Sequence, residues 1–333
     1  MPEASLLVCD DSNMARKQLL RALPTDWPVT VSQASNGEEA LEQLRAAHFD
    51  LLLLDLTMPV LDGYGVLAAL KAEGLAQKVI VVSGDVQEEA VRRVQELGAL
   101  AFLKKPADPE LLRQTLDRLG FLSAPSAPAT APVAALGEPK VSFRDAFREV
   151  VNVAMGQAAA LLARVLGVFV QLPIPNVNIL EVSELHMALA DAQRGNGLTA
   201  VCQGYIGGGI SGEALLIFHD SEVGDMARLM QWQQQNYSSM EMLLDMSSVI
   251  IGACLSGIAE QLDVSFSQGH PQVLGEHASI DELIRLNGQR WRKTLAVEVS
   301  YSIEGHNIHF DLLLLFTEDS VPLLTKKLAY LME

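Results

Sequence analysis

The sequence is poor in cysteine and in positive charge, and each shortage excludes a class of function. Its 333 residues include three widely spaced cysteines, Cys9, Cys202 and Cys254. An odd and scattered set of this kind does not suit a disulfide framework or a zinc site, so we expect reduced, mostly buried thiols of a cytosolic protein. Lys and Arg number 24 against 41 Asp and Glu, a formal net charge of −17, and both halves of the chain are acidic. This balance argues against nucleic acid or an anionic membrane as the principal partner.

The sequence also lacks an uncharged apolar run of membrane-spanning length. Its first residues, MPEASLLVCDDS, have no basic segment followed by an apolar one, so we expect no signal peptide. These absences predict a soluble, cytoplasmic protein with no membrane partner. The length, together with 49% hydrophobic residues, favours two globular domains.

One stretch, SAPSAPATAPVAALGEPK at residues 123–140, divides the chain. It is rich in Ala and Pro and shows neither helical nor strand periodicity, which is typical of an extended tether. We therefore expect a first domain at 1–122, a linker at 123–140 and a second domain at 141–333.

Apolar strands alternate with amphipathic helices before this linker. The five strand patterns are SLLVCDD, VTVSQAS, FDLLLLDLTM, KVIVVSGD and ALAFLKKP. Each is followed by a helical pattern, which predicts an α/β domain with a doubly wound (βα)5 parallel sheet covered on both faces.

Polar residues stand where these strands end. Asp10 and Asp11 follow the first strand and Asp55 follows the third. The carboxyl ends of parallel strands meet in one crevice, where three carboxylates repel one another unless a cation such as Mg²⁺ lies between them. Ser83 closes the fourth strand and Lys105 follows the fifth. A hydroxyl and an ammonium group at that place could orient and neutralise a phosphoryl group.

The pieces DDS, LLLLDLTMP, VSGD and KKP resemble the CheY-like receiver domains of bacterial two-component response regulators, across residues 5–120. The resemblance implies a flavodoxin-like fold, bound Mg²⁺ and a histidine kinase as phosphodonor. It also implies roles for individual side chains: the Mg²⁺ carboxylates Asp10 and Asp11, the phosphoacceptor and metal ligand Asp55, the switch hydroxyl Ser83, the switch aromatic Phe102 and the phosphate-pairing Lys105.

The segment after the linker contains an internal repeat. SFRDAFREVVNVAMG at 142–156 corresponds to SSMEMLLDMSSVIIG at 238–252, with a constant offset of 96 residues. The same offset relates Pro175 to Pro271. A single offset over several positions predicts an α+β domain of two halves related by a pseudo-two-fold, each opening with a long helix. Alternating patterns at 201–220 and 295–316 predict antiparallel strands.

In the first of these helices, Asp145, Glu149, Asn152 and Gly156 lie on one stripe. Ser142 and Asp145 have the spacing of a capping box, which explains Asp145 as a helix cap. Glu149 and Asn152 lie too deep in the helix for capping. Spacing alone leaves two readings for them, a solvated face or a face that presents a carboxylate and a carboxamide to a partner.

The pattern Asp145-xxx-Glu149-xx-Asn152, followed by Pro175, resembles the signature of the CheC/CheX-type chemotaxis phosphatases. These proteins hydrolyse the aspartyl phosphate of CheY-like receivers. The resemblance implies that Asn152 enters the receiver's site and positions the attacking water, while Glu149 pairs with the receiver's lysine. It further implies a CheC-like fold for residues 141–333.

The corresponding positions of the second half carry Asp245 and Ser248. Asp is one methylene shorter than Glu, and Ser lacks the paired donor and acceptor of a carboxamide. We therefore expect one active face, on the first helix, and a degenerate second face.

The leading hypothesis is a response regulator, phosphorylated on Asp55, whose output domain hydrolyses aspartyl phosphate on a CheY-like receiver. That receiver is either a separate protein or the chain's own. One rival is a non-enzymatic module that docks a chemotaxis or motor component under control of phosphorylation. A third reading is a phosphate sink whose second domain serves as a homodimerisation unit. Hydrolysis that depends on Asn152 distinguishes the first reading from the other two.

Overall fold

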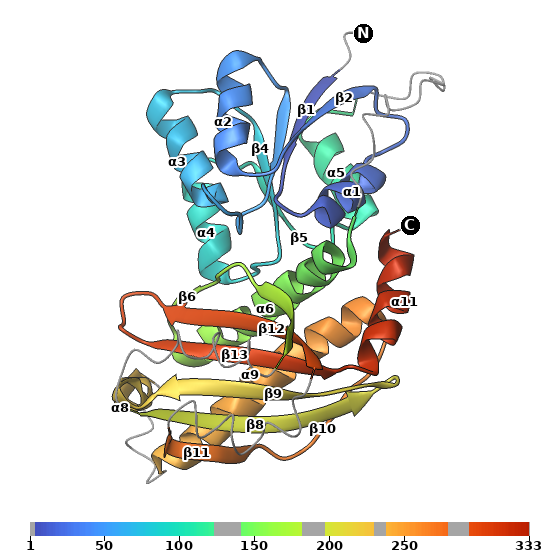
Figure 1. Ribbon diagram of the computed structural model, residues 1–333. Coiled ribbons are helices and arrows are strands. Elements are labelled where there is room, and N and C mark those ends of the chain that lie inside the picture. The colour runs from blue at the N-terminus through green and yellow to red at the C-terminus, as the bar shows by residue number, and fades with distance from the viewer. Residues whose placement is uncertain (1–3, 123–140, 182–196, 230–237, 279–292, 333) are drawn as a thin grey trace. The chain divides into compact units, whose positions relative to one another are not determined.

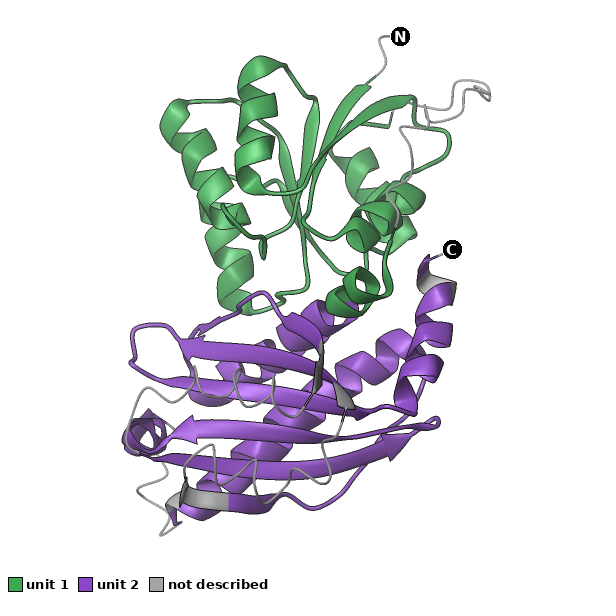
Figure 2. Cartoon of the chain, in the orientation of Figure 1, with its two compact units in different colours: residues 1–149 green, residues 150–333 purple. Residues whose placement is uncertain are grey.

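The computed structural model describes residues 4–122, 141–181, 197–229, 238–278 and 293–332. The chain divides into two units, residues 1–149 and 150–333 (Figure 2). The division falls inside helix α6, Phe143–Leu166, so the first two turns of that helix belong to the first unit. The predicted linker, 123–140, lies outside the described residues.

The first unit contains a five-stranded parallel sheet with the order β2-β1-β3-β4-β5. Its strands are β1 Ala4–Cys9, β2 Val29–Ala34, β3 Leu51–Leu54, β4 Val79–Ser83 and β5 Ala101–Lys104. Its helices are α1 Asn13–Ala22, α2 Gly37–Ala46, α3 Gly63–Glu73, α4 Glu88–Glu96 and α5 Pro109–Arg118. This order, with a helix after every strand, confirms the predicted flavodoxin-like sheet.

Strands β3 and β4 are apolar almost without interruption because helices cover both faces of this sheet (Figure 1), whereas the edge strand β2 includes polar residues. Leu52 and Leu54 of β3 belong to the core formed with α2, α3 and α4. Leu51 and Leu53 belong to the opposite core, formed with α1 and α5. Four helices of the unit begin with a side-chain cap, from Ser12, Asn36, Asp62 and Asp108.

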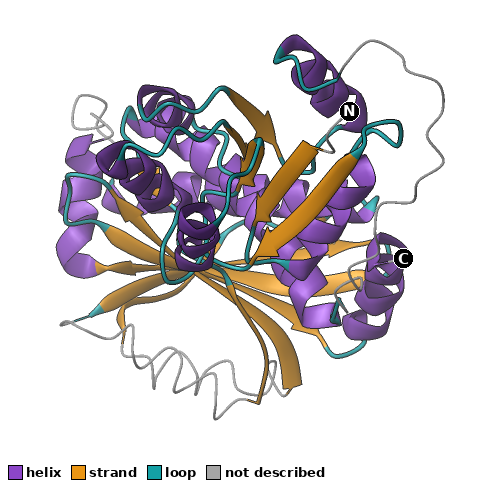
Figure 3. Ribbon diagram, turned by 90° about the horizontal axis from the view of Figure 1, so that it is seen from above, coloured by secondary structure: helices purple, strands orange, loops and turns teal. Residues whose placement is uncertain are grey.

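The second unit contains an eight-stranded antiparallel sheet, as the alternating patterns predict, and helices (Figure 3). The main path of the sheet is β10-β8-β9-β13-β12-β6, with β11 added to β8 and β7 added to β12. Its strands are β6 Val170–Gln171, β7 Asn176–Glu181, β8 Leu198–Gly207, β9 Ile210–His219, β10 Ser267–Gln268, β11 Gln272–Ala278, β12 Lys293–Ile303 and β13 His309–Thr317. Besides α6, its helices are α8 Asp220–Leu229, α9 Ser239–Leu262 and α11 Ser320–Met332.

The order of elements and the strand pairing repeat between the two halves of this unit. Helices α6 and α9 each have 24 residues and begin and end 96 positions apart. The halves meet where β9 pairs with β13. The short strands are exchanged, because β6 and β7 pair with β12 of the second half, whereas β10 and β11 pair with β8 of the first.

Helices α6 and α9 approach closely where Gly257 of α9 faces Ala154 of α6. A Cβ atom added at Gly257 would lie 2.7 Å from Ala154 Cα. Glycine is therefore required at this position by packing rather than by backbone conformation. Helix α9 also begins as its sequence predicts, with a complete capping box between Ser238 and Glu241.

Two helices are long and apolar enough to cross a membrane by length and composition alone, Phe143–Leu166 and Met240–Leu262. The search of the sequence for uncharged apolar runs did not find these helices, because each contains charged side chains. About 72% and 61% of their apolar windows are buried inside the structure. Buried core helices pass the same test, so this is weak evidence for a membrane span.

Candidate functional site

Three carboxylates gather at the carboxyl ends of the first unit's central strands. Asp10 and Asp11 follow β1, and Asp55 follows the adjacent strand β3. One carboxylate oxygen from each lies within 4.8 Å of the others, the one such cluster among the described residues. The sequence predicts this grouping, because adjacent parallel strands end at the same edge.

The backbone holds one oxygen of each buried carboxylate and leaves the other for a cation. Asp10 Oδ1 accepts a hydrogen bond from Ser12 N–H at 2.9 Å, and Asp55 Oδ1 accepts one from Leu56 N–H at 2.8 Å. The Oδ2 atoms face the ammonium group of Lys105 instead of a backbone N–H. They lie 2.7 Å and 3.1 Å from the Nζ atom of Lys105.

Burial and like charge oppose ionisation of Asp55 and Asp11. Burial raises the pKa of Asp55 well above its usual value, with Lys105 acting in the opposite direction and Asp10 adding to the rise. Burial also raises the pKa of Asp11. For Lys105, burial acts to lower the pKa, but the surrounding carboxylates hold it well above its usual value. The cluster therefore has more negative charge than one ammonium group can neutralise.

The first turns of α6, which belong to the same unit, add three contacts to this region. Glu149 Oε1 lies 3.2 Å from Lys105 Nζ. An Arg148 guanidinium nitrogen lies 3.1 Å from Asp11 Oδ2. Asp145 Oδ2 accepts a hydrogen bond from Met14 N–H, in the first turn of α1, at 3.0 Å. These side chains belong to three different positions of one helix face.

Two of these contacts differ from what the sequence suggests. Ser142 Oγ accepts the N–H of Asp145, as in a capping box, but the Asp145 carboxylate also reaches a neighbouring helix. Arg148 was not predicted as a site residue. Its signal in the sequence is weak, a basic residue three positions after Asp145 on the same helix face.

The side chain of Glu149 is buried beside Lys105, and burial raises its pKa to about 7. Lys105 acts in the opposite direction, favouring the charged form. The predicted pairing of Glu149 with a receiver lysine thus has a counterpart inside this chain.

The donor set fits a hard divalent cation. Four carboxylates, Asp10, Asp11, Asp55 and Glu149, face the two cations Lys105 and Arg148. The formal charge of these six groups is −2, and Asp145, 3.6 Å from Arg148, adds a further carboxylate, so the region has an excess of negative charge that Mg²⁺ would offset. Carboxylate oxygens from Asp10, Asp11 and Asp55 are ligands that Mg²⁺ accepts in proteins.

Of the other predicted receiver residues, Ser83 and Lys105 lie at the same edge of the sheet, whereas Phe102 lies within strand β5. Ser83 ends β4 and is fully buried, and its Oγ accepts a hydrogen bond from Asp85 N–H at 3.2 Å. Phe102 of β5 is half-buried against the core formed with α2, α3 and α4. Lys105, directly after β5, joins the carboxylate cluster as described.

The remaining predicted residues belong to the second unit. Asn152 follows Glu149 by three positions on the same face of α6. On α9, Asp245 is exposed and Ser248 is half-buried. The two helices thus carry the matched positions that the repeat predicts.

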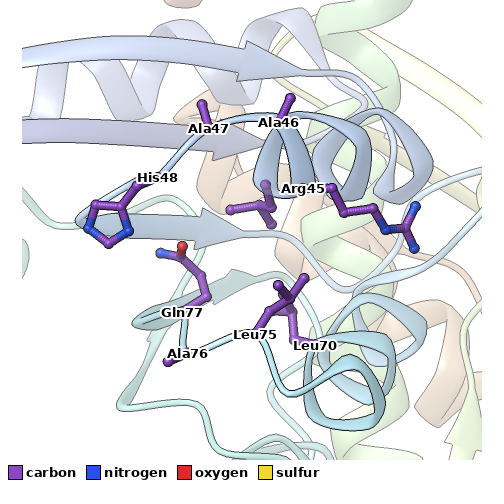
Figure 4. Close-up of a pocket in the computed structure, with 9 residues that line it drawn as sticks. Arg45, Ala46, Ala47, His48, Leu70, Leu75, Ala76 and Gln77 are labelled. Atoms are coloured by element: carbon purple, nitrogen blue, oxygen red, sulfur yellow. The ribbon is translucent and has the colours of Figure 1, made fainter.

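A separate pocket of about 340 Å³ lies at the opposite end of β3 (Figure 4). It is lined where α2 and α3 end, by Arg45, His48, Leu70, Leu75 and Gln77 among others. Asp55 follows the carboxyl end of β3, whereas this pocket adjoins the residues before Leu51. The pocket is therefore not part of the carboxylate site.

Comparisons with known proteins identify the first unit. Residues 6–117 match the family "Response regulator receiver domain". The transcriptional regulatory protein ZraR of Escherichia coli (strain K12) is 35% identical over 113 residues, which are 34% of this chain and 25% of ZraR. The chain thus spans about a quarter of the length of that relative.

Two solved structures are similar to parts of the chain. A chain of the CheX-CheY-BeF3-Mg+2 complex from Borrelia burgdorferi has 28% identity and a TM-score of 0.34, covering 36% of this chain and 90% of that one. Thermotoga maritima FliY has 18% identity and a TM-score of 0.43, covering 56% of this chain and 96% of that one.

The parallel sheet, the acidic cluster and the family match together define the class of the first unit. Residues 6–117 form a CheY-like receiver domain of a response regulator in two-component signalling. Receiver domains in general take their phosphoryl group from a histidine kinase, and they bind Mg²⁺ at an acidic cluster such as the one described here.

Proposed function

We propose that Asp55 is the phosphoacceptor and that α6 carries a phosphatase face which hydrolyses aspartyl phosphate on a CheY-like receiver. In this proposal residues 141–333 are a CheC/CheX-type output domain, with Glu149 and Asn152 as its active residues. Asp245 and Ser248 of α9 then form the degenerate counterpart.

The observation that supports the proposal most is the contact between Glu149 and Lys105. Glu149 Oε1 lies 3.2 Å from the Nζ atom that also faces Asp55 Oδ2 at 3.1 Å. A helix that reaches this amine brings its next polar side chain, Asn152, to the same face one turn later. A solvated helix face would not bury a glutamate beside a lysine and two aspartates.

The chemistry asks little of the protein beyond position and charge. The oxygen of a water molecule bonds to phosphorus, and the bond between phosphorus and the Asp55 carboxylate oxygen breaks, leaving its electron pair on the carboxylate. Both water protons leave with the product as dihydrogen phosphate, which releases one of them to solvent. Bound Mg²⁺ would supply positive charge at the phosphoryl oxygens.

The protein's own residues have three tasks in this step. Lys105 pairs with a phosphoryl oxygen, and Glu149 holds the Lys105 ammonium group in place. The Asn152 carboxamide has one donor group and one acceptor oxygen, which together can hold a water in line with the breaking bond.

The test is the lifetime of aspartyl phosphate in wild type and in the Asn152→Ala variant. The protein is phosphorylated by a small acyl phosphate in Mg²⁺, and the decay is followed after the donor is removed. The same proteins are added in catalytic amounts to a separate phosphorylated CheY-like receiver. We expect Asn152→Ala to lengthen the lifetime on the substrate receiver by about 10- to 100-fold, because the water is no longer positioned.

Ser248→Ala is the matched control, since it truncates the corresponding position of α9 and should leave the lifetime unchanged. Equal lifetimes for wild type and Asn152→Ala on both receivers, from folded samples, would refute the phosphatase. The face of α6 would then be a docking surface, as in the binding-module hypothesis.

A further inference from the structure

We propose that the receiver served by α6 is the one in the same chain, and that Arg148 aligns the helix on it by pairing with Asp11. This inference rests on the proposed phosphatase function. It adds the identity of the substrate, the chain's own Asp55 phosphate, and a specificity-determining residue outside the Glu149 and Asn152 pair.

Three contacts carry the inference, and all of them lie within the first unit, residues 1–149. Asp145 accepts a hydrogen bond from the first turn of α1, Arg148 pairs with the loop after β1, and Glu149 pairs with Lys105 after β5. The helix side supplies positions i, i+3 and i+4, which form one face. The receiver side supplies two separate segments, residues 11–14 and Lys105, so the contacts determine both the rotation and the position of the helix start.

Each contact is chemically matched. The Asp145 carboxylate lies at the N-terminus of α1, where unpaired N–H groups and the helix dipole favour negative charge. The Arg148 guanidinium is 31% exposed and its partner Asp11 only 10%, so the pair is partly shielded from water. Asp145 also lies 3.6 Å from Arg148 and orients the guanidinium towards Asp11.

Covalent connection favours this receiver over a separate one. The chain from Leu122 to Phe143 joins the receiver to α6 covalently, and a connection of such length gives an effective concentration on the order of millimolar. A separate CheY-like protein at micromolar concentration would have to displace a partner with contacts already made.

The pairing has a second consequence, because Asp11 belongs both to the Arg148 pair and to the predicted cation site. A positive guanidinium beside Asp11 disfavours a divalent cation at the same carboxylate. By linkage, removal of Arg148 should strengthen Mg²⁺ binding to the receiver.

The first experiment separates the chain's own receiver from another copy. Asn152→Ala chains, which can be phosphorylated but lack the water-positioning carboxamide, are mixed with Asp55→Asn chains, which keep Asn152 but lack the acceptor. We expect wild-type decay to be first order and independent of protein concentration over roughly a hundredfold range. We also expect Asp55→Asn chains not to accelerate decay of the Asn152→Ala phosphate.

Acceleration in proportion to added Asp55→Asn chain would overturn the inference and leave the proposed function intact. Equal decay of wild type and Asn152→Ala at every concentration would also overturn the inference. The assay on a separate phosphorylated CheY-like receiver then decides whether the proposed function stands.

The second experiment tests Arg148 by two measurements, the rate of phosphate decay and the affinity for Mg²⁺. A folding defect would not slow the decay and at the same time tighten Mg²⁺ binding. Arg148→Ala should slow the decay about fivefold and tighten Mg²⁺ binding, measured by calorimetry, by about the same factor. Arg148→Lys keeps the positive charge but not the guanidinium fork. Its decay rate and its Mg²⁺ affinity should therefore lie between those of wild type and those of Arg148→Ala.

Arg164→Ala is the control, because Arg164 is exposed in the last turn of the same helix. It should match wild type in both measurements. Wild-type decay and wild-type Mg²⁺ affinity in Arg148→Ala would show that the ion pair does not align the helix, and would overturn this part of the inference.

Discussion

At the scale of single residues, the carboxyl group of Asp85 is buried outside the acidic cluster. It follows β4 and is 4% exposed, and its Oδ1 accepts a hydrogen bond from Gln87 N–H at 3.1 Å. Burial raises its pKa to about 6, although this hydrogen bond and the Arg93 guanidinium act in the opposite direction. Asp85 in turn adds to the rise in the pKa of the nearby Tyr64 hydroxyl, which is caused mainly by burial.

This shift predicts a pH-dependent stability. The folded protein binds a proton at Asp85 up to about pH 6, whereas the unfolded chain releases it near the ordinary value of 3.8. The contribution of this group to stability is therefore full below pH 4 and falls as the pH rises to 6 and beyond. Asp85→Asn, which mimics the neutral form, should raise the free energy of unfolding at pH 8 by up to about 3 kcal/mol and change it little at pH 4.

Urea denaturation of wild type and variant at the two pH values measures this difference. Asp26→Asn is a control of opposite sign, because the side-chain hydrogen bond from Arg113 lowers the pKa of Asp26 to about 2. Its removal should weaken stability slightly at pH 8. An Asp85→Asn variant that is equally stable to wild type at pH 8 would contradict the argument from burial.

At the scale of elements, Gly257 and Gly252 of α9 differ in the space available for a side chain, because only Gly257 packs against α6. A Cβ atom at Gly257 would lie 2.7 Å from the backbone of Ala154, whereas one at Gly252 would come no closer than 3.5 Å to the flexible end of Gln268. Gly257→Ala should lower the free energy of unfolding by about 1–3 kcal/mol, because the helices must separate.

Gly252→Ala is the matched control, since it changes the same residue type in the same helix. It should be neutral or stabilising by about 0.5–1 kcal/mol, because Ala is the better helix former. Chemical denaturation of both variants checks the pair. Similar changes in the free energy of unfolding at both positions would show that close packing between α6 and α9 does not require glycine at position 257.

Much of the element structure could be predicted from the sequence, and the failures have physical reasons. The five apolar runs predict the parallel strands because a strand covered on both faces needs no polar side. Strands β6, β7, β10 and β11 were missed; β6 and β10 have two residues each, which cannot show a period. The cluster of Asp10, Asp11 and Asp55 follows from strand topology, whereas the Arg148 contact depends on where a distant helix packs, which local pattern does not determine.

At the scale of the whole molecule, Mg²⁺ should act on one of the two units. At a Mg²⁺ concentration of about 100 times the dissociation constant, binding adds about 2.7 kcal/mol to the free energy of unfolding of the receiver. In scanning calorimetry we expect the receiver transition to rise by several degrees and to return when the ion is chelated.

Asp11→Asn should reduce this shift, because it removes one carboxylate of the cluster. Asp245→Asn changes an exposed carboxylate of α9 and should leave the shift unchanged. A shift that persists in full in Asp11→Asn would place the cation elsewhere.

The exchange of short strands between the halves of the second unit has an evolutionary consequence. Strands β6 and β7 complete their pairing on β12, and β10 and β11 complete theirs on β8, so each repeat supplies edge partners for the other. Deleting either copy would strip the survivor of its neighbours and expose its strand edges. The second copy is therefore needed for the architecture of the sheet whatever residues occupy positions 245 and 248, so a substitution there would not remove the reason to keep the repeat.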